Sequence, residues 1–432
     1  MKEILKDKYY VHLDTKKHHK NYERLIKDIK WVKQHGFYPF IHFNMKLDKY
    51  IRDHNGDKYL KHKRRDIYYS AHIDRFIYEY YGNRLNDKYN IYAKKSGIDE
   101  VSIAYRNCKH NKSNIDFAKE VFEFIVKNEA AYIFVGDFSE FFDTLDHKYL
   151  KTQIKKVNGN NSLDDADYAI FKNLTRFTYV EMEDIEKYKK SKIKDMRHLT
   201  KYFDTEEFQK FKKNNLKKHT KDYGIPQGSA ISSIYANIYM IDFDKNINHY
   251  ISKLGGIYRR YSDDIIIVVP TNFSNEYLKE VQKIQEFIFT EKDKIKNLKL
   301  NKDKTKEYFY ENGKINNISG KSDIIDYLGF CFDGCNVSIR EKSVFKFYYR
   351  AYKKIKKVNK IESPKSFNAG KKAVYRLYTH LGNNNHNSLH GNFITYAYKA
   401  DSIFSKSKYL KSNIRKQVKR HWNKISNKLK KI

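Results

Sequence analysis

Residues 256–270 read GIYRRYSDDIIIVVP, and this stretch decides which fold the chain is expected to adopt. It holds two runs rich in β-branched and aromatic residues, joined through Ser262, Asp263 and Asp264. Two such runs with a polar joint predict a β-hairpin that carries carboxylates at its tip. An ionised aspartate beside an apolar strand is costly unless water solvates it or a cation neutralises it, so this tip is a candidate metal site.

A second apolar run ends on an aspartate in the same way. Residues 130–138 read AAYIFVGDF, which has the length of a strand and places Asp137 at its end. If both segments belong to one sheet, Asp137, Asp263 and Asp264 meet at one edge and can bridge two Mg²⁺ ions. Two such ions, roughly 3.5–4 Å apart, stabilise the attacking and leaving oxygens of a phosphoryl displacement. One aspartate alone is more typical of a turn or a helix cap, but the combination indicates phosphoryl transfer.

Five segments follow one another in an order that resembles motifs A, B, C, D and E of reverse transcriptases. They read GDFSEFFDTLDH (136–147), YGIPQGSAISSIYANIYM (223–240), YSDD (261–264), LKLNKDKT (298–305) and IDYLGF (325–330). The resemblance covers about residues 60–335 and implies an α+β fold of the right-hand polymerase type. It implies fingers and N-terminal helices over 1–128, a palm of antiparallel sheet and helices over 129–335, and a basic helical thumb over 336–432.

The same resemblance assigns roles to single residues of the metal site. Asp137, Asp263 and Asp264 become the catalytic, metal-binding carboxylates, and the backbone carbonyl of Phe138 becomes a further metal ligand. Phe142 falls where the family places a steric gate against the ribose 2′-hydroxyl. A core position for the ring stays open as the alternative.

Further residues are expected to contact the incoming nucleotide. Pro226, Gln227 and Gly228 form a turn whose glutamine lies beside the nucleotide, and the glycine allows close backbone approach there. Lys304 fits the lysine near the triphosphate, a candidate general acid for pyrophosphate departure. The serines at 229, 232 and 233 are expected to cap or pack the following helix.

The fingers offer two candidate arginines for the triphosphate. Residues 61–67 read KHKRRDI, and Arg65 heads a pattern that resembles the basic clamp of the family. Arg106 competes for the same role, since a guanidinium binds phosphate oxygens in a bidentate manner. A solvated basic face remains the alternative for both. Residues 63–82 are predicted to form an amphipathic helix that Gly82 stops.

Charge supports a polyanionic partner independently of the motifs. Lys and Arg number 87 against 52 Asp and Glu, which gives a formal net charge of +35, and 68 aromatic residues offer stacking surfaces. Residues 340–432 hold 25 of the basic and three of the acidic residues, so the basic residues of this region are expected to bind nucleic acid.

Composition excludes several other classes. Gly and Pro together number 21, which argues against disordered and collagen-like chains. No run of about 18 uncharged apolar residues exists, so no membrane span is expected. Three cysteines are too few for a disulfide framework or a zinc site, and the start of the chain has no apolar signal segment, so a cytoplasmic location is expected.

The function implied by the resemblance is RNA-directed DNA polymerisation. It would add dNTPs to a DNA primer on an RNA template with two Mg²⁺ ions, for which Mn²⁺ is a substitute. HIDRFIYEYY (72–81) and IAYR (103–106) look most like the bacterial "unknown group" and abortive-infection enzymes of antiphage defence. This resemblance implies a partner for the chain, and the candidates are a dedicated noncoding RNA, a second reverse transcriptase, an accessory defence protein and a second copy of the chain. A group II intron-like maturase and a non-polymerising RNA-binding subunit stay open as alternatives.

Overall fold

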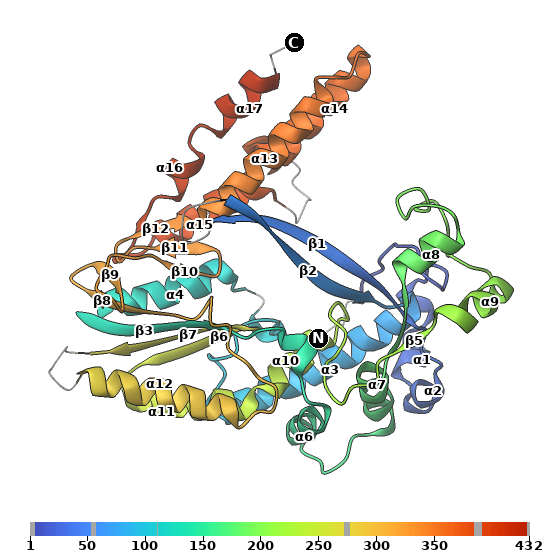
Figure 1. Cartoon of the computed structure of the whole chain (residues 1–432), viewed down its shortest axis with the longest axis horizontal. Helices are drawn as coiled ribbons and strands as arrows, with labels where there is room; N and C mark the ends of the chain where they lie inside the picture. The colour runs from blue at the N-terminus through green and yellow to red at the C-terminus, as the bar shows by residue number, and fades with distance from the viewer. Residues whose placement is uncertain (1–4, 53–57, 110, 272–276, 384–390, 430–432) are drawn as a thin grey trace.

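The computed structural model describes the whole chain except residues 1–4, 53–57, 110, 272–276, 384–390 and 430–432. Within the described residues the chain forms three β-sheets with helices packed around them, as Figure 1 shows. The mixed α+β class expected from the sequence is confirmed. No helix among the described residues is both long and apolar enough to cross a membrane.

The central sheet carries the two segments that the sequence singled out. Its strands are β3 (Ala130–Asp137), β6 (Ile257–Tyr261), β7 (Asp264–Pro270), β8 (Lys306–Glu311) and β9 (Lys314–Asn317). They pair antiparallel in the order β6-β7-β3-β8-β9. The predicted hairpin is therefore formed by β6 and β7, and β3 lies directly beside it.

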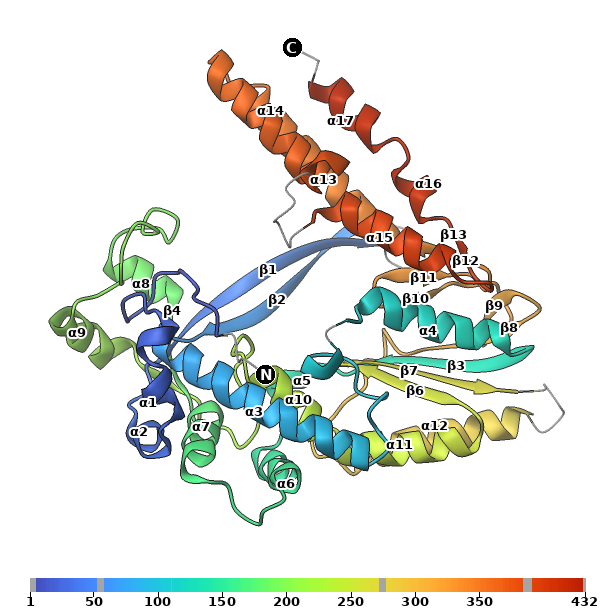
Figure 2. The ribbon, with the colours of Figure 1, turned by 180° about the vertical axis from the view of Figure 1, so that it is seen from behind.

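Both faces of this sheet are covered, which explains why β3 is apolar throughout. Tyr132 and Phe134 pack into one hydrophobic cluster together with α11 (Ile241–Lys253) and α12 (Tyr277–Asp293). The alternate residues Ala131 and Ile133 pack into a second cluster with α4 (Asn114–Lys127). Figures 1 and 2 show α4 on one face of the sheet and α11 and α12 on the other. A strand buried on both faces loses the usual alternation of apolar and polar residues.

A long hairpin, the fingers hairpin, lies in the region that is predicted to form the fingers. Strands β1 (Phe40–Arg52) and β2 (Lys58–Tyr69) pair antiparallel along their length, and β4 (Thr178–Glu181) and β5 (Lys217–Lys218) extend the sheet. Helix α3 (His72–Lys95) follows β2. The prediction of one helix over 63–82 is therefore wrong on two counts: residues 63–69 are strand, and the helix continues past Gly82.

The C-terminal region contains a small sheet and a group of helices that project from it. The sheet consists of β10 (Ile325–Tyr327), β11 (Phe330–Phe332), β12 (Asn336–Ile339) and β13 (Lys411–Ser412). The helices are α13 (Glu341–Val358), α14 (Pro364–Tyr378), α15 (Phe393–Ser405), α16 (Ile414–Val418) and α17 (His421–Leu429). Figures 1 and 2 show α13, α14 and α17 extending away from the central sheet, on the same side as β1 and β2.

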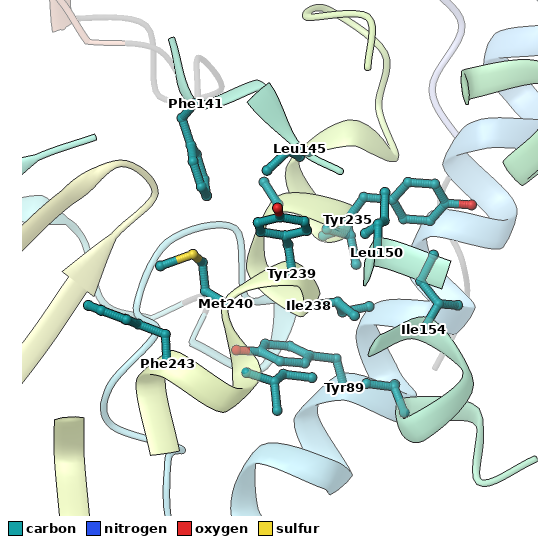
Figure 3. Close-up of a cluster of buried hydrophobic side chains, with 14 of the residues drawn as sticks. Tyr89, Phe141, Leu145, Leu150, Ile154, Tyr235, Ile238, Tyr239, Met240 and Phe243 are labelled. Carbon is teal, nitrogen blue, oxygen red and sulfur yellow. The ribbon is translucent and has the colours of Figure 1, made fainter. Parts of the chain in front are cut away.

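The remaining elements are short or lie beneath the site. They are the 3₁₀ turns His19–Asn21, Asn107–Lys109 and His380–Asn383, and the helices α1 (Glu23–Lys27), α2 (Ile29–Gln34), α5 (Phe141–Thr144), α6 (His147–Asn158), α7 (Asp165–Thr175), α8 (Met182–Tyr188), α9 (Thr205–Asn215) and α10 (Ser232–Tyr239). Figure 3 shows the hydrophobic cluster under α5, in which Phe141 and Leu145 point toward Tyr239 and its neighbours on α10.

Candidate active site

The three aspartates lie at one end of the central sheet. Asp137, the last residue of β3, is the direct cross-strand partner of Asp264, the first residue of β7. Asp263 lies in the turn between β6 and β7, and its carbonyl accepts a 3.0 Å hydrogen bond from the backbone N–H of Phe138. Sheet pairing therefore brings together carboxylates that are more than 120 residues apart in the sequence.

The turn that presents Asp263 is held from below by a buried ionic network. Ser262 adopts a left-handed backbone conformation with φ 61°, and its carbonyl accepts a 3.1 Å hydrogen bond from the guanidinium of Arg260. Arg260 also pairs with Asp244 of α11 and donates to the side chain of Asn237 on α10. Arg260 and Asp244 expose no side-chain surface. The network thus fixes the turn to the two helices packed beneath it.

The carboxylates repel one another strongly. Burial, followed by the negative charges of Asp263 and Asp137, raises the pKa of Asp264 to about 7. The pKa of Asp263 is also raised, first by burial and then by Asp137, whereas the charges of Lys304 and Arg65 lower it. This excess of negative charge is the condition under which a divalent cation binds well.

Lys304 supplies a positive charge to this cluster. Its Nζ lies 2.6 Å from Oδ1 of Asp137, and its side chain is 48% exposed against 10% for Asp137. Lys304 lies in the loop before β8, where the backbone N–H of Asn301 donates to the carbonyl of Asp137 at 2.7 Å. The lysine expected near the triphosphate therefore lies at the carboxylates, within reach of a phosphate bound there.

The residues at this edge suit Mg²⁺ by their chemistry. Hard carboxylate oxygens are the ligands that Mg²⁺ prefers, and Lys304 occupies the position of a cation at Asp137. Within the described part of the chain, no group of three or more His, Cys, Asp and Glu side chains is already gathered closely enough to hold a metal ion. The aspartates would have to close around the ion, and Lys304 would have to release Asp137.

The two phenylalanines of motif A have different surroundings. Phe141 is 3% exposed and packs in the cluster of Figure 3, with its ring 5.9 Å from that of Phe138. Phe142 is half-buried at the margin of the same cluster, and its carbonyl accepts a hydrogen bond from the N–H of Ile225. Of the two rings, that of Phe142 is the one able to meet a ligand.

The predicted Pro-Gln-Gly turn contacts the fingers hairpin directly. The carbonyl of Gln227 accepts a 2.8 Å hydrogen bond from the backbone N–H of Tyr68 in β2. Gly228 has φ 121°, and a Cβ there would lie 2.6 Å from the carbonyl oxygen of Tyr68. Glycine is therefore required by the packing of the turn against β2, a reason that differs from the predicted approach of a nucleotide. The Gln227 side chain is half-buried beside this contact.

The two candidate arginines of the fingers differ sharply. Arg65 is exposed on β2, and its charge acts on the carboxylate of Asp263. The Arg106 side chain is fully buried, pairs with Asp99 at 2.6 Å and donates to the carbonyl of Ser102. The prediction that Arg106 binds the triphosphate is therefore corrected, because its guanidinium is already used to fold the 99–106 loop.

The serines after the turn have packing roles, as expected. Ser232 donates to the carbonyl of Pro226 at 2.8 Å and Ser233 to that of Ala230 at 3.4 Å. The hydroxyl of Ser229 is buried and has no hydrogen-bond partner in the described structure.

Arg260, Asp244 and Asn237 were not singled out from the sequence. The signal that could have revealed Arg260 and Asp244 is a charged residue within a strand or helix whose neighbours are mostly apolar.

The basic C-terminal region presents a mixed cationic and aromatic face on α13. Phe345 and Tyr349 are 73% and 67% exposed, one helical turn apart. Lys342, Lys346 and Lys353 are exposed along the same stripe of the helix. Exposed rings interleaved with lysines are typical of nucleic-acid-binding surfaces.

The comparisons with known proteins define the class. The model of the family "Reverse transcriptase (RNA-dependent DNA polymerase)" matches residues 60–332. The chain therefore belongs to the reverse transcriptase family, whose members are RNA-directed DNA polymerases and hence nucleotidyltransferases. The predicted right-hand polymerase fold is confirmed. No curated protein matches the chain in sequence.

Telomerases from Candida species are among the similar solved structures. The apo telomerase of Candida tropicalis is 13% identical, with a TM-score of 0.42, covering 98% of this chain and 66% of that one. The form truncated from its C-terminal domain is also 13% identical, with a TM-score of 0.44, and the match covers 68% of this chain and 55% of that one. The telomerase of Candida albicans in complex with a TWJ fragment of telomeric RNA is 12% identical, with a TM-score of 0.40, and the match covers 92% of this chain and 61% of that one. The chain thus spans about three fifths of the length of these structures.

Proposed function

We propose that this chain is an active RNA-directed DNA polymerase that extends a DNA primer with dNTPs. The observation that carries the proposal is the cross-strand pairing of Asp137 with Asp264, with Asp263 in the adjoining turn. A protein that only binds RNA has no need of three mutually repelling carboxylates at the end of an apolar sheet. The intact set therefore favours polymerisation over the non-polymerising RNA-binding subunit.

Reverse transcriptases generally use Mg²⁺, and in this chain Asp137, Asp263, Asp264 and the carbonyl of Phe138 would hold it. Bound there, Mg²⁺ would neutralise the charge that develops on the attacking and leaving oxygens. In the reaction, the primer 3′-oxygen bonds to the α-phosphorus of the dNTP, and the bond from that phosphorus to the bridging oxygen breaks to release pyrophosphate.

The side chains around the aspartates bind and orient the nucleotide. Lys304 carries its proton at Nζ and can donate it to the departing pyrophosphate once it has released Asp137. Arg65 faces the same charges from β2 and would bind the triphosphate through its guanidinium. Gln227 would lie beside the base or sugar, and Phe142 would exclude a ribose 2′-hydroxyl by filling its space.

The biological setting rests on resemblance alone. The segments at 72–81 and 103–106 look like those of bacterial enzymes of antiphage defence, so we propose a role of that kind in the cytoplasm. The partners would be an RNA template, with a dedicated noncoding RNA as the candidate, and a second reverse transcriptase or defence protein. A group II intron-like maturase is less well supported because no observation on the structure favours it.

The test is to purify the full chain, sequence the nucleic acid that accompanies it, and assay primer extension on RNA and DNA templates of one sequence. We expect dNTP incorporation that requires Mg²⁺ and copies RNA. Bound RNA without any incorporation on either template would overturn the proposal in favour of a binding subunit. Incorporation on DNA alone would overturn its RNA-directed part.

A further inference from the structure

A basic cavity of about 640 Å³ has a lining that includes none of the three aspartates of the candidate active site. It is bounded by α6, α7 and the residues that follow β5. Figures 1 and 2 both show α6 and α7 on the side of the central region opposite β1 and β2. Six of its lining side chains carry positive charge and make no ion pair with any described residue: Lys148, Lys151, Lys172, Arg176, Lys218 and Lys221.

The two acidic side chains of the cavity, Asp146 and Asp222, share a single lysine. Nζ of Lys296, a seventh basic residue of the lining, lies 3.8 Å from Asp146 and 3.4 Å from Asp222. Asp146 also caps α6 by accepting a hydrogen bond from the N–H of Tyr149. Seven basic and two acidic lining residues leave five net positive charges on this concave surface, which concentrates polyanions.

The two histidines of the lining are structural. Burial lowers the pKa of both His147 and His219, and their Nε2 atoms bond to the backbone carbonyls of Gly224 and Tyr223. They shape the wall of the cavity without adding charge near neutral pH.

An exposed aromatic ring stands among the lysines. Tyr168 of α7 is 46% exposed, and Nζ of Lys151 lies 4.7 Å from its ring centroid. A groove of cations with an exposed ring is the arrangement that binds single-stranded nucleic acid, in which phosphates meet the cations and bases stack on the ring. A single small anion would need neither the ring nor six cations from separate elements.

Backbone hydrogen bonds link the rim of the cavity to segments of the candidate active site. Asp146 pairs with Tyr223 in an antiparallel bridge, and the N–H of Gly224 donates to the carbonyl of Leu145 at 2.8 Å. These residues continue the segments that carry Phe142 and Gln227. The rim of the cavity and the walls of the nucleotide site are therefore parts of the same two chain segments.

We propose that this cavity binds a single strand of nucleic acid through its phosphates, with Tyr168 as a stacking surface. The occupant is the unpaired portion of the template, an identification that rests on the proposed polymerase function. The contact lies outside the catalytic edge, so it governs how long the template is retained and leaves the chemical step unaffected.

The test compares the full chain with two triple variants that each remove three positive charges. K148Q/K172Q/K218Q alters the cavity, and K253Q/K279Q/K283Q alters exposed lysines of α11 and α12 that have no ion pair in the described structure. Binding is measured against salt for primer–templates with a long unpaired template end, with none, and for single-stranded RNA and DNA of one sequence, with inorganic pyrophosphate as competitor.

We expect the cavity variant to lose about tenfold in affinity for the long-ended template relative to the control variant. Its plot of log K against log salt should be shallower by about 2, since each lost phosphate contact on a single strand contributes about 0.7. Binding of the blunt primer–template and the rate of single incorporation at saturation should match the control. An equal loss of affinity for single-stranded RNA and single-stranded DNA would confirm that the cavity binds the phosphates of the strand.

Two results would overturn the inference. Equal affinities of the cavity and control variants for the long-ended template would show that no strand binds there. Full displacement of the strand by pyrophosphate would show a site for small anions instead. Strand binding is measured without catalysis, so the two proposals can fail separately. If the chain never polymerises but its cavity variant loses strand binding, the proposed polymerase function is contradicted and the strand-binding site in the cavity is supported.

Discussion

Arg260 and Asp244 form an ion pair of 2.6 Å in which neither side chain is exposed. The guanidinium also donates to the carbonyl of Ser262, the residue before Asp263. A buried pair of this kind is stable only as a whole, because removal of one partner leaves an uncompensated charge in the interior. The turn that presents Asp263 thus depends on a buried charge outside the proposed catalytic set.

Replacement of Asp244 by asparagine should destabilise the chain by about 3–5 kcal/mol, since Arg260 would remain buried and unpaired. The matched control is Asp242→Asn on the same helix, whose carboxylate pairs with Lys156 while both side chains are 39% exposed. That change should cost less than about 1 kcal/mol. Urea unfolding followed by circular dichroism measures the free energy of unfolding of both variants. Equal losses of stability would show that the buried ion pair contributes no more than the exposed one.

Asp263→Asn should abolish polymerisation without unfolding the chain. The substitution removes one charge and nearly preserves shape, so RNA binding should survive while incorporation falls by at least about a thousandfold. Primer extension at saturating Mg²⁺ measures the loss, and thermal unfolding checks the fold. Near wild-type incorporation by the variant would remove Asp263 from the catalytic set.

Phe142→Val should admit ribonucleotides. The half-buried ring is expected to fill the space of a 2′-hydroxyl, so truncation should raise the relative kcat/KM for rNTPs at least about tenfold, or ~1.4 kcal/mol. The control is Phe141→Val, which opens the core at a 3% exposed ring and should cost stability of about 2–4 kcal/mol with no gain in rNTP use. Unchanged discrimination in a folded Phe142→Val variant would place the gate elsewhere.

Acid should destabilise the fingers through His12. This residue is fully buried, and burial lowers its pKa to about 4, although Asp14 and the carbonyl of Tyr69 act in the opposite direction. Because the folded pKa lies below the unfolded value, the contribution of His12 is complete above pH 6.5 and is lost as the pH falls toward 4. Between pH 7.5 and 5 the loss should be about 2 kcal/mol.

The matched variant for this prediction is His12→Gln. Its amide can donate to the carbonyl of Tyr69, as the Nε2–H of His12 does at 3.1 Å, but it does not titrate. The free energy of unfolding should therefore depend less on pH in the variant over this window. Identical slopes in the two proteins would exclude His12 as the group responsible.

The lysines of α13 should hold the duplex. K342Q/K346Q/K353Q removes three exposed charges from the stripe that carries Phe345 and Tyr349. The plot of log K against log salt for a blunt primer–template should become shallower by about 2 to 3. The triple variant of Lys253, Lys279 and Lys283 serves again as the control, and an unchanged slope would mean that this face points away from the nucleic acid.

The sequence was most informative where local pattern and long-range pairing agree. The apolar runs before Asp137 and after Asp264 each specify a buried strand, and the order of the five motifs indicates how they assemble. Residues 63–69 show the opposite case. Their pairing with β1 outweighs the helical pattern, and α3 continues through Gly82, where a Cβ would make an ordinary contact of 3.5 Å with Ile231.

Side chains that act through distant partners could not be predicted. The burial of Arg106 depends on Asp99 and on the ring of Tyr89, 5.0 Å from the guanidinium, and neither is marked by any motif. Gly228 suggested a nucleotide contact, but its nearest neighbour is a carbonyl of β2. A sequence shows that a position needs glycine more readily than it shows what approaches it.

The hydrogen bond from Tyr68 to Gln227 has a kinetic consequence. It joins the base of the fingers hairpin to the turn that we propose lies beside the nucleotide, so any movement of the hairpin that keeps this bond carries the turn with it. The two walls would then open and close as one gate, and a single rate constant would describe admission of the nucleotide. Selection of the base by the turn and clamping of the triphosphate by the hairpin would be simultaneous events.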